Sequence, residues 1–232
     1  MKIIVCIKQV PDTTEVKLDP KTGRLIRDGV PSIINPDDKN ALEEALRIKD
    51  ENPDTTVTVV SMGPPQADVA MREALAMGAD EAILISGREF GGSDTWATSY
   101  IIATAIKKIP DYDIIFCGRQ AIDGDTAQVG PQIAEQLNIP QITYVQKLDI
   151  EGDKVIVQRQ LEDGYTVVEA KMPVLLTAIK ELNTPRYMTP KGICEAYNKT
   201  VQVWGFNDVP VDAEKIGLKG SPTNVNRTFS PE

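Results

Sequence analysis

The residues best suited to chemistry lie in a loop of small and polar residues, at positions 118–130. The apolar run 114–116 before it is typical of a strand buried on both faces. The segment after it is typical of a helix with Pro131 in first position. Such a connection leaves unpaired N–H groups and the positive end of a helix dipole facing an anion. The sequence therefore predicts a phosphate site here.

The side chains of this loop fit that prediction. Its glycines allow the backbone to approach a ligand closely, and Thr126 and Gln128 can donate hydrogen bonds. An ordinary strand–helix connection capped by Asp125 fits the same residues and stays an alternative. The loop matches neither G-x-G-x-x-G nor the Walker pattern, so it carries no general nucleotide fingerprint.

Composition excludes several classes of function. The chain has 232 residues and a net charge of −9 without a long basic run, which argues against nucleic-acid binding. Histidine is absent, which removes Ser-His and Cys-His dyads and imidazole zinc sites. The three cysteines have no paired spacing and are expected to be reduced thiols. Any chemistry is therefore expected to come from a cofactor, with no catalytic side chain and no metal.

The hydrophobic segments are short. None approaches the roughly 20 apolar residues of a membrane span. The apolar run 3–7 is too short for a signal peptide and is typical of a strand. We expect a cytoplasmic protein without membrane or nucleic-acid partners.

Strands and helices alternate through the first part of the chain. Apolar runs predict strands at 2–7, 56–61, 82–86 and 174–179, and helical periodicity predicts helices that start at Pro36 after an Asn35 cap and cover 66–77 and 100–109. This alternation predicts an α/β, Rossmann-like fold with a mostly parallel sheet and helices on both faces.

Four loops are expected at the carboxyl edge of this sheet. They cover residues 8–13, 35–38, 61–65 with 91–98, and 118–130. Such a long groove suits a nucleotide or dinucleotide. A small surface hairpin is predicted over 16–18 and 24–26.

The pattern changes after Pro140. Strands separated by turn residues predict an antiparallel meander at about 142–172. We therefore expect a nucleotide-binding domain over 1–182 and a loop-rich C-terminal tail over 183–232. The tail has little periodic apolar content, and Trp204 and Phe206 are expected to be exposed, so it is predicted to contact a partner chain.

Six motifs spread over the chain resemble the β subunit of an electron-transfer flavoprotein. They are CIKQVPDT at 6–13, NPDDKNALEEALRIKD at 35–50, VVSMGP at 59–64, REALAMGADEA at 72–82, GRQAIDGDTAQVGPQIAEQL at 118–137 and TPRYMT at 184–189. The resemblance implies a heterodimer with a flavin-carrying α subunit that passes electrons to an acyl-CoA dehydrogenase-type protein. Ile193 would take the place of the leucine that mitochondrial-type members present to their dehydrogenase.

The resemblance also implies an adenine nucleotide in this chain. In simpler members it is AMP, with a structural role. In electron-bifurcating members it is FAD, which takes a hydride from NADH and sends one electron to the α flavin and one to ferredoxin or flavodoxin. The residues carried over are Cys6, Asn35, Asp38, Met62, Gly118, Arg119, Gln120, Ala121, Gly124, Asp125, Thr126, Ala127, Gln128, Val129 and Gly130.

Segment 91–98 separates the two kinds of member and resembles the bifurcating type. Here the added flavin contacts would be Ser93, Asp94, Thr95 and Thr98. Residues 10–13 favour FAD as well. Helix capping explains Asp94 and Thr95 equally well. A subunit with structural AMP and a stand-alone nucleotide-binding module stay open, as does whether Arg119 contacts a flavin, a phosphate or a surface carboxylate.

Overall fold

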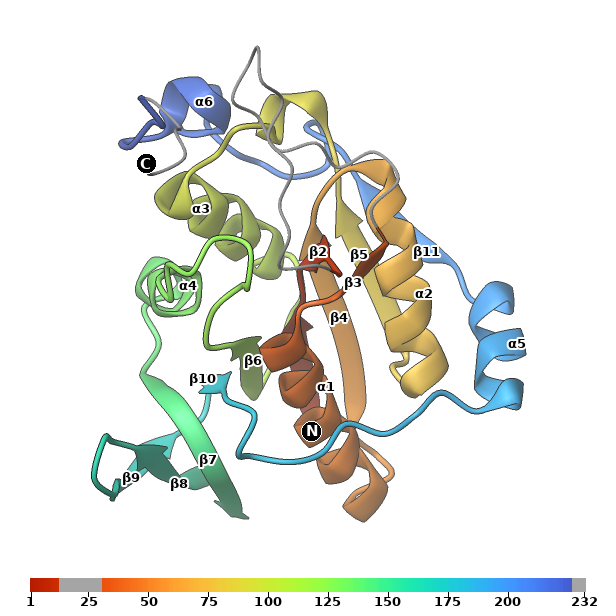
Figure 1. Ribbon diagram of the computed structural model, residues 1–232, viewed down its shortest axis with the longest axis vertical. Helices are drawn as coiled ribbons and strands as arrows, with labels where there is room; N and C mark the ends of the chain where they lie inside the picture. Colours follow the sequence, from red (N-terminus) through yellow and green to blue (C-terminus); the bar gives the residue numbers. More distant parts are fainter. Residues whose placement is uncertain (13–30, 227–232) are drawn as a thin grey trace, which may run out of the picture.

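The computed structural model describes residues 1–12 and 31–226 (Figure 1). The hairpin predicted over 16–18 and 24–26 lies outside the described residues. The main sheet has nine strands in the order β11-β5-β4-β1-β6-β10-β7-β8-β9. Its parallel strands are β11 (Val201–Trp204), β5 (Glu81–Ile85), β4 (Thr56–Met62), β1 (Lys2–Cys6), β6 (Ile114–Gly118), β10 (Val174–Ala178) and β7 (Gln141–Glu151).

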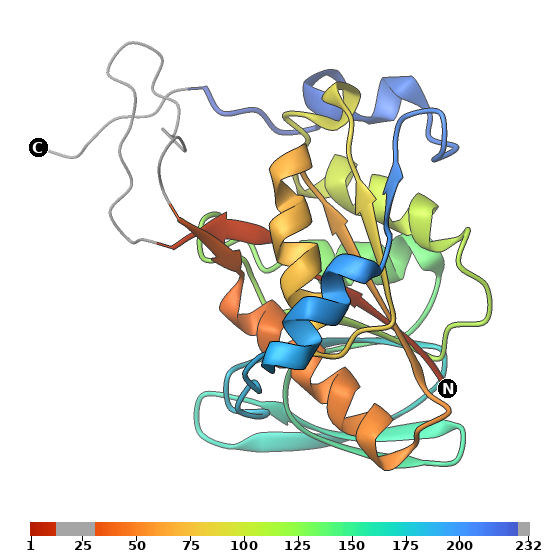
Figure 2. The ribbon, with the colours of Figure 1, turned by 90° about the vertical axis from the view of Figure 1, so that its right-hand side faces the viewer.

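The central strands are apolar on both faces because helices cover both. Ile4 of β1 pairs with Ile115 of β6, and their side chains enter one core; their neighbours Ile3 and Ile114 enter the other. One core packs against α1 (Pro36–Glu51) and α2 (Asp68–Met77), the other against α3 (Thr95–Ile106) and α4 (Val129–Leu137), as Figures 1 and 2 show. The predicted Rossmann-like α/β fold is confirmed.

Two predicted helix starts are wrong in detail, whereas α1 begins at Pro36 as predicted and only its side-chain cap is missing. Helix α3 begins at Thr95, five residues before the predicted start at Tyr100. Pro131 is the third residue of α4, because the helix already begins at Val129. Asn35 precedes α1, but its side chain makes no capping hydrogen bond there, because it contacts the 118–130 loop instead.

The predicted meander is confirmed. Strand β7 pairs antiparallel with β8 (Lys154–Gln160), which pairs with β9 (Tyr165–Lys171). Strand β10 then returns between β6 and β7, as its continuous apolar run predicts. A separate antiparallel pair, β2 (Gln9–Pro11) and β3 (Ser32–Ile34), follows β1.

The C-terminal region folds back onto the sheet. It forms α5 (Pro190–Asn198), strand β11 beside β5, the short 3₁₀ helix η3 (Ala213–Lys215) and α6 (Gly217–Gly220). The predicted exposure of Trp204 and Phe206 is wrong, because both are half-buried against the α3 and α4 core. The domain boundary at residue 182 stays a prediction. None of the described helices combines the length and apolar character needed to cross a membrane.

Candidate functional site

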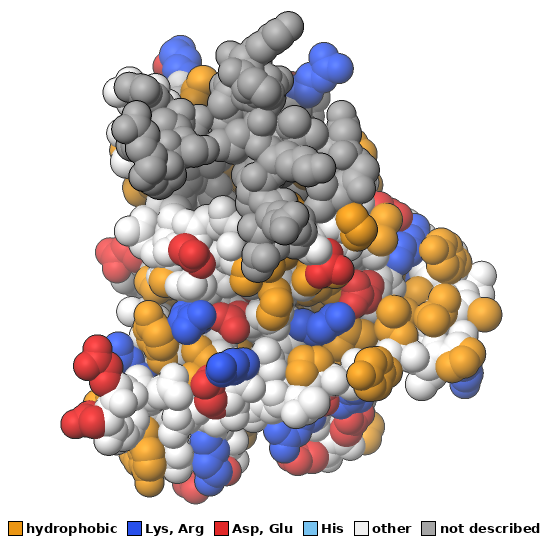
Figure 3. Space-filling view, viewed as in Figure 1, with side chains coloured by type: hydrophobic (Ala, Val, Ile, Leu, Met, Phe, Trp, Pro, Cys, Tyr) orange, Lys and Arg blue, Asp and Glu red, His pale blue; other side chains and the backbone are white. Residues whose placement is uncertain are grey.

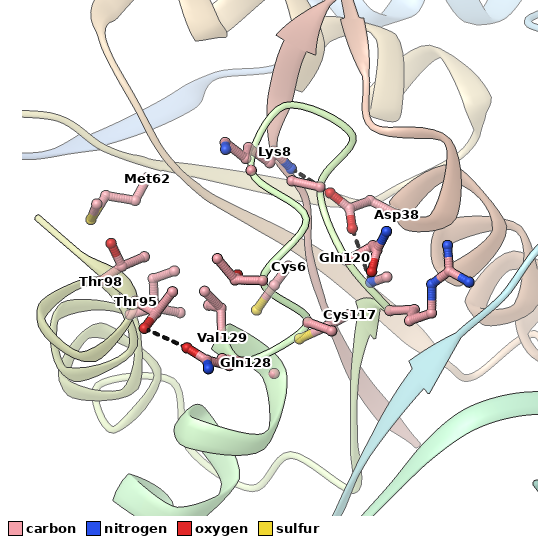
Figure 4. Close-up of a pocket in the computed structure, with 18 of the residues that line it drawn as sticks. Cys6, Lys8, Asp38, Met62, Thr95, Thr98, Cys117, Gln120, Gln128 and Val129 are labelled. Carbon is pink, nitrogen blue, oxygen red and sulfur yellow. Dashed lines mark hydrogen bonds between the residues drawn. The ribbon is translucent and has the colours of Figure 1, made fainter. Parts of the chain in front are cut away.

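A cavity of about 370 Å³ opens where β1, β4 and β6 end (Figure 4). The predicted loops meet there, so the expected convergence at the carboxyl edge of the sheet is confirmed. The lining residues are Cys6, Ile7, Lys8, Asp38, Met62, Ser93, Asp94, Thr95, Thr98, Ile102, Cys117, Gly118, Arg119, Gln120, Ala121, Gly124, Thr126, Ala127, Gln128, Val129 and Gly130.

All the predicted site residues line this cavity except Asn35 and Asp125. Asn35 supports the loop from behind: its amide donates to the Gln120 carbonyl at 2.8 Å and its oxygen accepts from the Ile122 N–H at 3.0 Å. The Asp125 carboxylate accepts from the Gln120 side chain at 2.8 Å. That the lining residues contact a nucleotide stays a prediction.

Four lining residues were missed by sequence reasoning: Ile7, Lys8, Ile102 and Cys117. Strand register could have found Cys117, because it lies directly opposite Cys6 on the neighbouring strand. Helical spacing could have found Ile102, one turn after Thr98.

Asp38 connects the ends of the two central strands. Its carboxylate accepts from the Lys8 N–H at 2.7 Å and from the Gly118 N–H at 2.9 Å (Figure 4). Burial raises the pKa of Asp38 to about 7, although these hydrogen bonds oppose the rise. A Cβ on Gly118 would lie 2.2 Å from the carboxylate, so only glycine fits beside it.

The backbone after Gly124 forms a concave surface. Asp125 and Ala127 adopt left-handed conformations, with φ of 49° and 52°. Gln128 follows with φ −109° and ψ −29°, a right-handed conformation. A left-handed residue followed by a right-handed one turns successive N–H groups toward one point, where an anion can bind.

Helix α4 starts at this concave surface without a side-chain cap. Its N-cap residue is Gln128, which makes no capping hydrogen bond, so the alternative in which Asp125 caps the helix is wrong. The first N–H groups of α4 have no carbonyl partner within the helix. Gly130 is needed for packing, because a Cβ there would lie 2.9 Å from Thr177 of β10. Close approach of a ligand to the glycines stays a prediction.

Most of the polar side chains in the loop before α3 already make hydrogen bonds within the chain. The Ser93 hydroxyl donates to the Phe90 carbonyl at 2.8 Å and accepts from the Gly217 N–H at 3.0 Å. The Thr95 hydroxyl donates to the Gln128 side chain at 3.1 Å. With the described residues, the Thr98 hydroxyl makes no hydrogen bond. Of the three predicted hydroxyls in this segment, it is therefore the one with a proton available for a ligand.

Asp94 caps α3, which confirms the capping alternative for this residue. One carboxylate oxygen accepts from the Ala97 N–H at 3.0 Å, and the other accepts from the Thr223 N–H and hydroxyl at 2.9 and 2.7 Å. Partial burial opposes ionisation, but these hydrogen bonds prevail and lower the pKa of Asp94.

Both cations in the cavity wall are paired. The Lys8 ammonium lies 2.6 Å from a carboxylate oxygen of Asp123. Arg119 Nε lies 3.3 Å from Asp37 Oδ2, in an ion pair without hydrogen-bond geometry, and its guanidinium lies 6.0 Å from the Tyr144 ring centroid. Arg119 thus pairs with a carboxylate here, and its contact with a flavin or a phosphate stays a prediction. Across residues 1–12 and 31–226, no cluster of three or more acidic, Cys or His side chains could hold a metal ion.

Sequence comparison identifies the family. A sequence model of the "Electron transfer flavoprotein domain" matches residues 22–209. The chain belongs to the electron-transfer flavoprotein family. The β-subunit resemblance carried by the motifs is confirmed by a relative whose name is that of a β subunit.

Relatives in this family align with the whole chain. It is 66% identical over 232 residues to "Electron transfer flavoprotein subunit beta" of Thermoanaerobacterium thermosaccharolyticum, covering 100% of this chain and 88% of the relative. It is 61% identical over 231 residues to "Caffeyl-CoA reductase-Etf complex subunit CarD" of Acetobacterium woodii, covering 100% and 88%. It is 54% identical over 239 residues to "Acryloyl-CoA reductase electron transfer subunit gamma" of Anaerotignum propionicum, covering 100% and 89%.

Proposed function

We propose that this chain is the β subunit of a bifurcating electron-transfer flavoprotein and that its cavity holds FAD. Bound FAD would accept a hydride from NADH and divide the electrons between ferredoxin or flavodoxin and, through the α-subunit FAD, an acyl-CoA dehydrogenase-type partner. The observation that carries the proposal is that two helices, α3 and α4, start at the wall of one cavity.

Two helix starts suit a ligand with two phosphates. The N–H groups at Ala127–Gln128 and the uncapped start of α4 would bind one phosphate. At the start of α3 Asp94 already takes the Ala97 N–H, so the Thr98 hydroxyl, which lines the cavity, would be the donor to the second. The hydrogen bond from Thr95 to Gln128 holds the two helix starts together. A diphosphate such as that of FAD is therefore the anion that uses both.

The rest of the wall suits aromatic rings. Cys6, Met62, Ile102 and Val129 present sulfur and hydrocarbon to the cavity. Ligand cavities in proteins are typically apolar, with a few polar groups that fix orientation. No side chain is required as an acid or base, so the residues of this chain bind and orient the rings and keep water from them.

AMP with a structural role is the second candidate, and a specific observation favours it. The side chains of Ser93, Asp94 and Thr95 already bond within the chain. Only the site at α4 would then hold a phosphate. A cavity of about 370 Å³ is also near the lower end of the roughly 300–1,000 Å³ usual for ligand sites.

The partner part of the proposal rests on the relatives and on a surface. The names of two relatives place them with caffeyl-CoA and acryloyl-CoA reductases, which supports an acyl-CoA dehydrogenase-type partner beside the α subunit. Over α5, apolar side chains gather on the surface (Figure 3), among them the exposed Ile193 and Tyr197. We also propose that ferredoxin or flavodoxin is the other electron acceptor and that the protein is cytoplasmic.

The test is the nucleotide content of the complex purified with its α subunit. Acid release should give two FAD and no AMP per heterodimer, and NADH should then reduce ferredoxin or flavodoxin. One FAD and one AMP would overturn the bifurcating proposal and leave an electron carrier with structural AMP.

The Thr98→Val variant tests whether the bound nucleotide reaches the start of α3. Valine keeps the shape of threonine but removes the hydroxyl that faces the cavity. We expect weaker FAD binding and unchanged AMP binding. The matched control is Thr104→Val on the same helix, whose hydroxyl bonds to the Tyr100 carbonyl at 2.7 Å.

A further inference from the structure

Two cysteines lie directly opposite each other in the floor of the cavity. Cys6 ends β1, and its register partner on the adjacent strand β6 is Cys117. Both side chains lie on the same face of the sheet and line the cavity, and Figure 4 shows both sulfurs there. Both are free thiols.

We propose that Cys6 and Cys117 form a dithiol–disulfide couple that a low-molecular-weight disulfide oxidises through the open cavity. The third cysteine, Cys194, is exposed on α5 and takes no part.

The strand geometry permits the bond. Neighbouring strands lie about 4.8 Å apart, and disulfides form across Cα separations of roughly 4.4–6.8 Å. In-register residues on parallel strands point to the same face, so the two thiols approach each other without a change of backbone direction. A hydrogen bond with Cys6 is the largest cause that raises the pKa of Cys117, followed by burial. The two thiols therefore lie close together.

The cavity gives an opening to these thiols. Cys6 is 9% and Cys117 is 6% exposed, and both residues line this cavity. A small disulfide that enters the cavity can therefore reach them, whereas a ligand that fills it covers them. Oxidation and ligand binding are thus expected to compete.

The reaction balances by two exchange steps. One protein thiolate attacks a sulfur of the small disulfide, forms a mixed disulfide and releases one small thiolate. The second protein thiolate attacks the protein sulfur of that mixed disulfide, forms the Cys6–Cys117 bond and releases the second small thiolate. Two protein thiols lose two electrons, the small disulfide gains them, and the two protons end on the released thiols.

The experiment uses the complex with its α subunit after nucleotide removal. It is incubated with oxidised glutathione, remaining thiols are alkylated, and peptides of this chain are mapped by mass spectrometry. We expect a peptide pair linked through Cys6 and Cys117, lost again on treatment with dithiothreitol. The same pair should form in the Cys194→Ser variant. In Cys117→Ser, Cys6 should keep one glutathione, because the second step is blocked.

Alkylated Cys6 and Cys117 after this treatment, or one glutathione on each, would overturn the proposal. So would a linked pair that forms only in denaturant. A repeat with AMP or FAD tests the competition, and this arm alone rests on the proposed function. Equal oxidation with and without either nucleotide would count against the cavity as the nucleotide site, while the disulfide itself would stand.

Discussion

At the residue scale, the sequence predicted Asp38 as a site residue. It did not predict the main hydrogen bonds that the Asp38 carboxylate makes. The sequence places it in the first turn of α1, where a carboxylate usually interacts with the helix dipole. The structure places it between two strand ends, which no local pattern encodes, because Lys8 and Gly118 are brought together only by the pairing of β1 with β6.

The raised pKa of Asp38 predicts a pH-dependent stability. The usual value is 3.8 and the folded value is about 7. Between these values the folded state holds a proton that the unfolded state has released, so the free energy of unfolding falls as pH rises. The Asp38 contribution is fully present below pH 4 and lost above pH 7, on the order of 4 kcal/mol in total.

Denaturant unfolding of wild type and Asp38→Asn across this range checks the prediction. Asparagine cannot ionise, so the free energy of unfolding of wild type minus variant should decline from pH 4 to pH 7 and then level off. Parallel curves for the two proteins would contradict the assignment.

Ala127 carries backbone strain that the sequence could not reveal. A left-handed conformation, φ 52°, costs an L-residue roughly 1–2 kcal/mol. Ala127→Gly should therefore raise the free energy of unfolding by about 1 kcal/mol, measured by denaturant titration, and keep nucleotide affinity. Ala134→Gly, inside the right-handed α4, is the matched control and should lower it by about 1 kcal/mol or more. A loss of stability in Ala127→Gly would contradict the prediction.

At the element scale, long periodic segments were predicted well and short ones poorly. Helices α1 and α2 and the meander follow from repeated apolar spacing. Strand β11 has four residues, and only Val201 among them is buried, so its sequence alone cannot show that it pairs with β5. The early start of α3 depends on Asp94, whose role as a cap was open from sequence.

The C-terminal segment is bonded to the loop before α3. The Ser221 hydroxyl accepts from the Asp94 N–H at 2.8 Å, and Thr223 donates twice to the Asp94 carboxylate. Asp94→Ala removes the cap of α3 and both Thr223 bonds, and should cost about 1–2 kcal/mol. Hydrogen exchange should rise in both 93–98 and 221–224.

Thr223→Val separates these two effects. It removes the hydroxyl bond but leaves the cap, since Ala97 still donates to Asp94. Exchange should then rise at 221–224 and stay low at Ala97. Equal exposure of both segments in Thr223→Val would contradict this division of roles.

At the scale of the whole molecule, one ion-pair cluster fixes the chain beyond β10. The Arg186 guanidinium donates to Glu43 at 2.8 and 3.0 Å and to Asp50 at 2.7 Å. Glu43 is buried on α1, so the anchor is rigid. Arg186 lies in the motif TPRYMT at 184–189, one of those that resemble the family. Its bonds to Glu43 and Asp50 give a physical reason for an arginine at this position.

This anchor presents the next residues to solvent. Tyr187 is 96% exposed, and Ile193 is also exposed. We expect the double variant Tyr187→Ser, Ile193→Ser to slow electron transfer to the acyl-CoA dehydrogenase-type partner by about tenfold or more, because each anchor lost costs about 1 kcal/mol or more of binding. Nucleotide content and thermal stability should not change, because neither side chain contributes to the core.

The matched control replaces another exposed apolar pair, Val167→Ser with Tyr165→Ser on β9. Both pairs remove comparable exposed surface, so a general effect on solubility or folding would appear in both. If the partner binds beyond Arg186, the rate of electron transfer to it falls only in the Tyr187 and Ile193 variant. Equal rates in the two variants would place the docking surface elsewhere, whereas loss of nucleotide in the first would mean that these residues support the cavity.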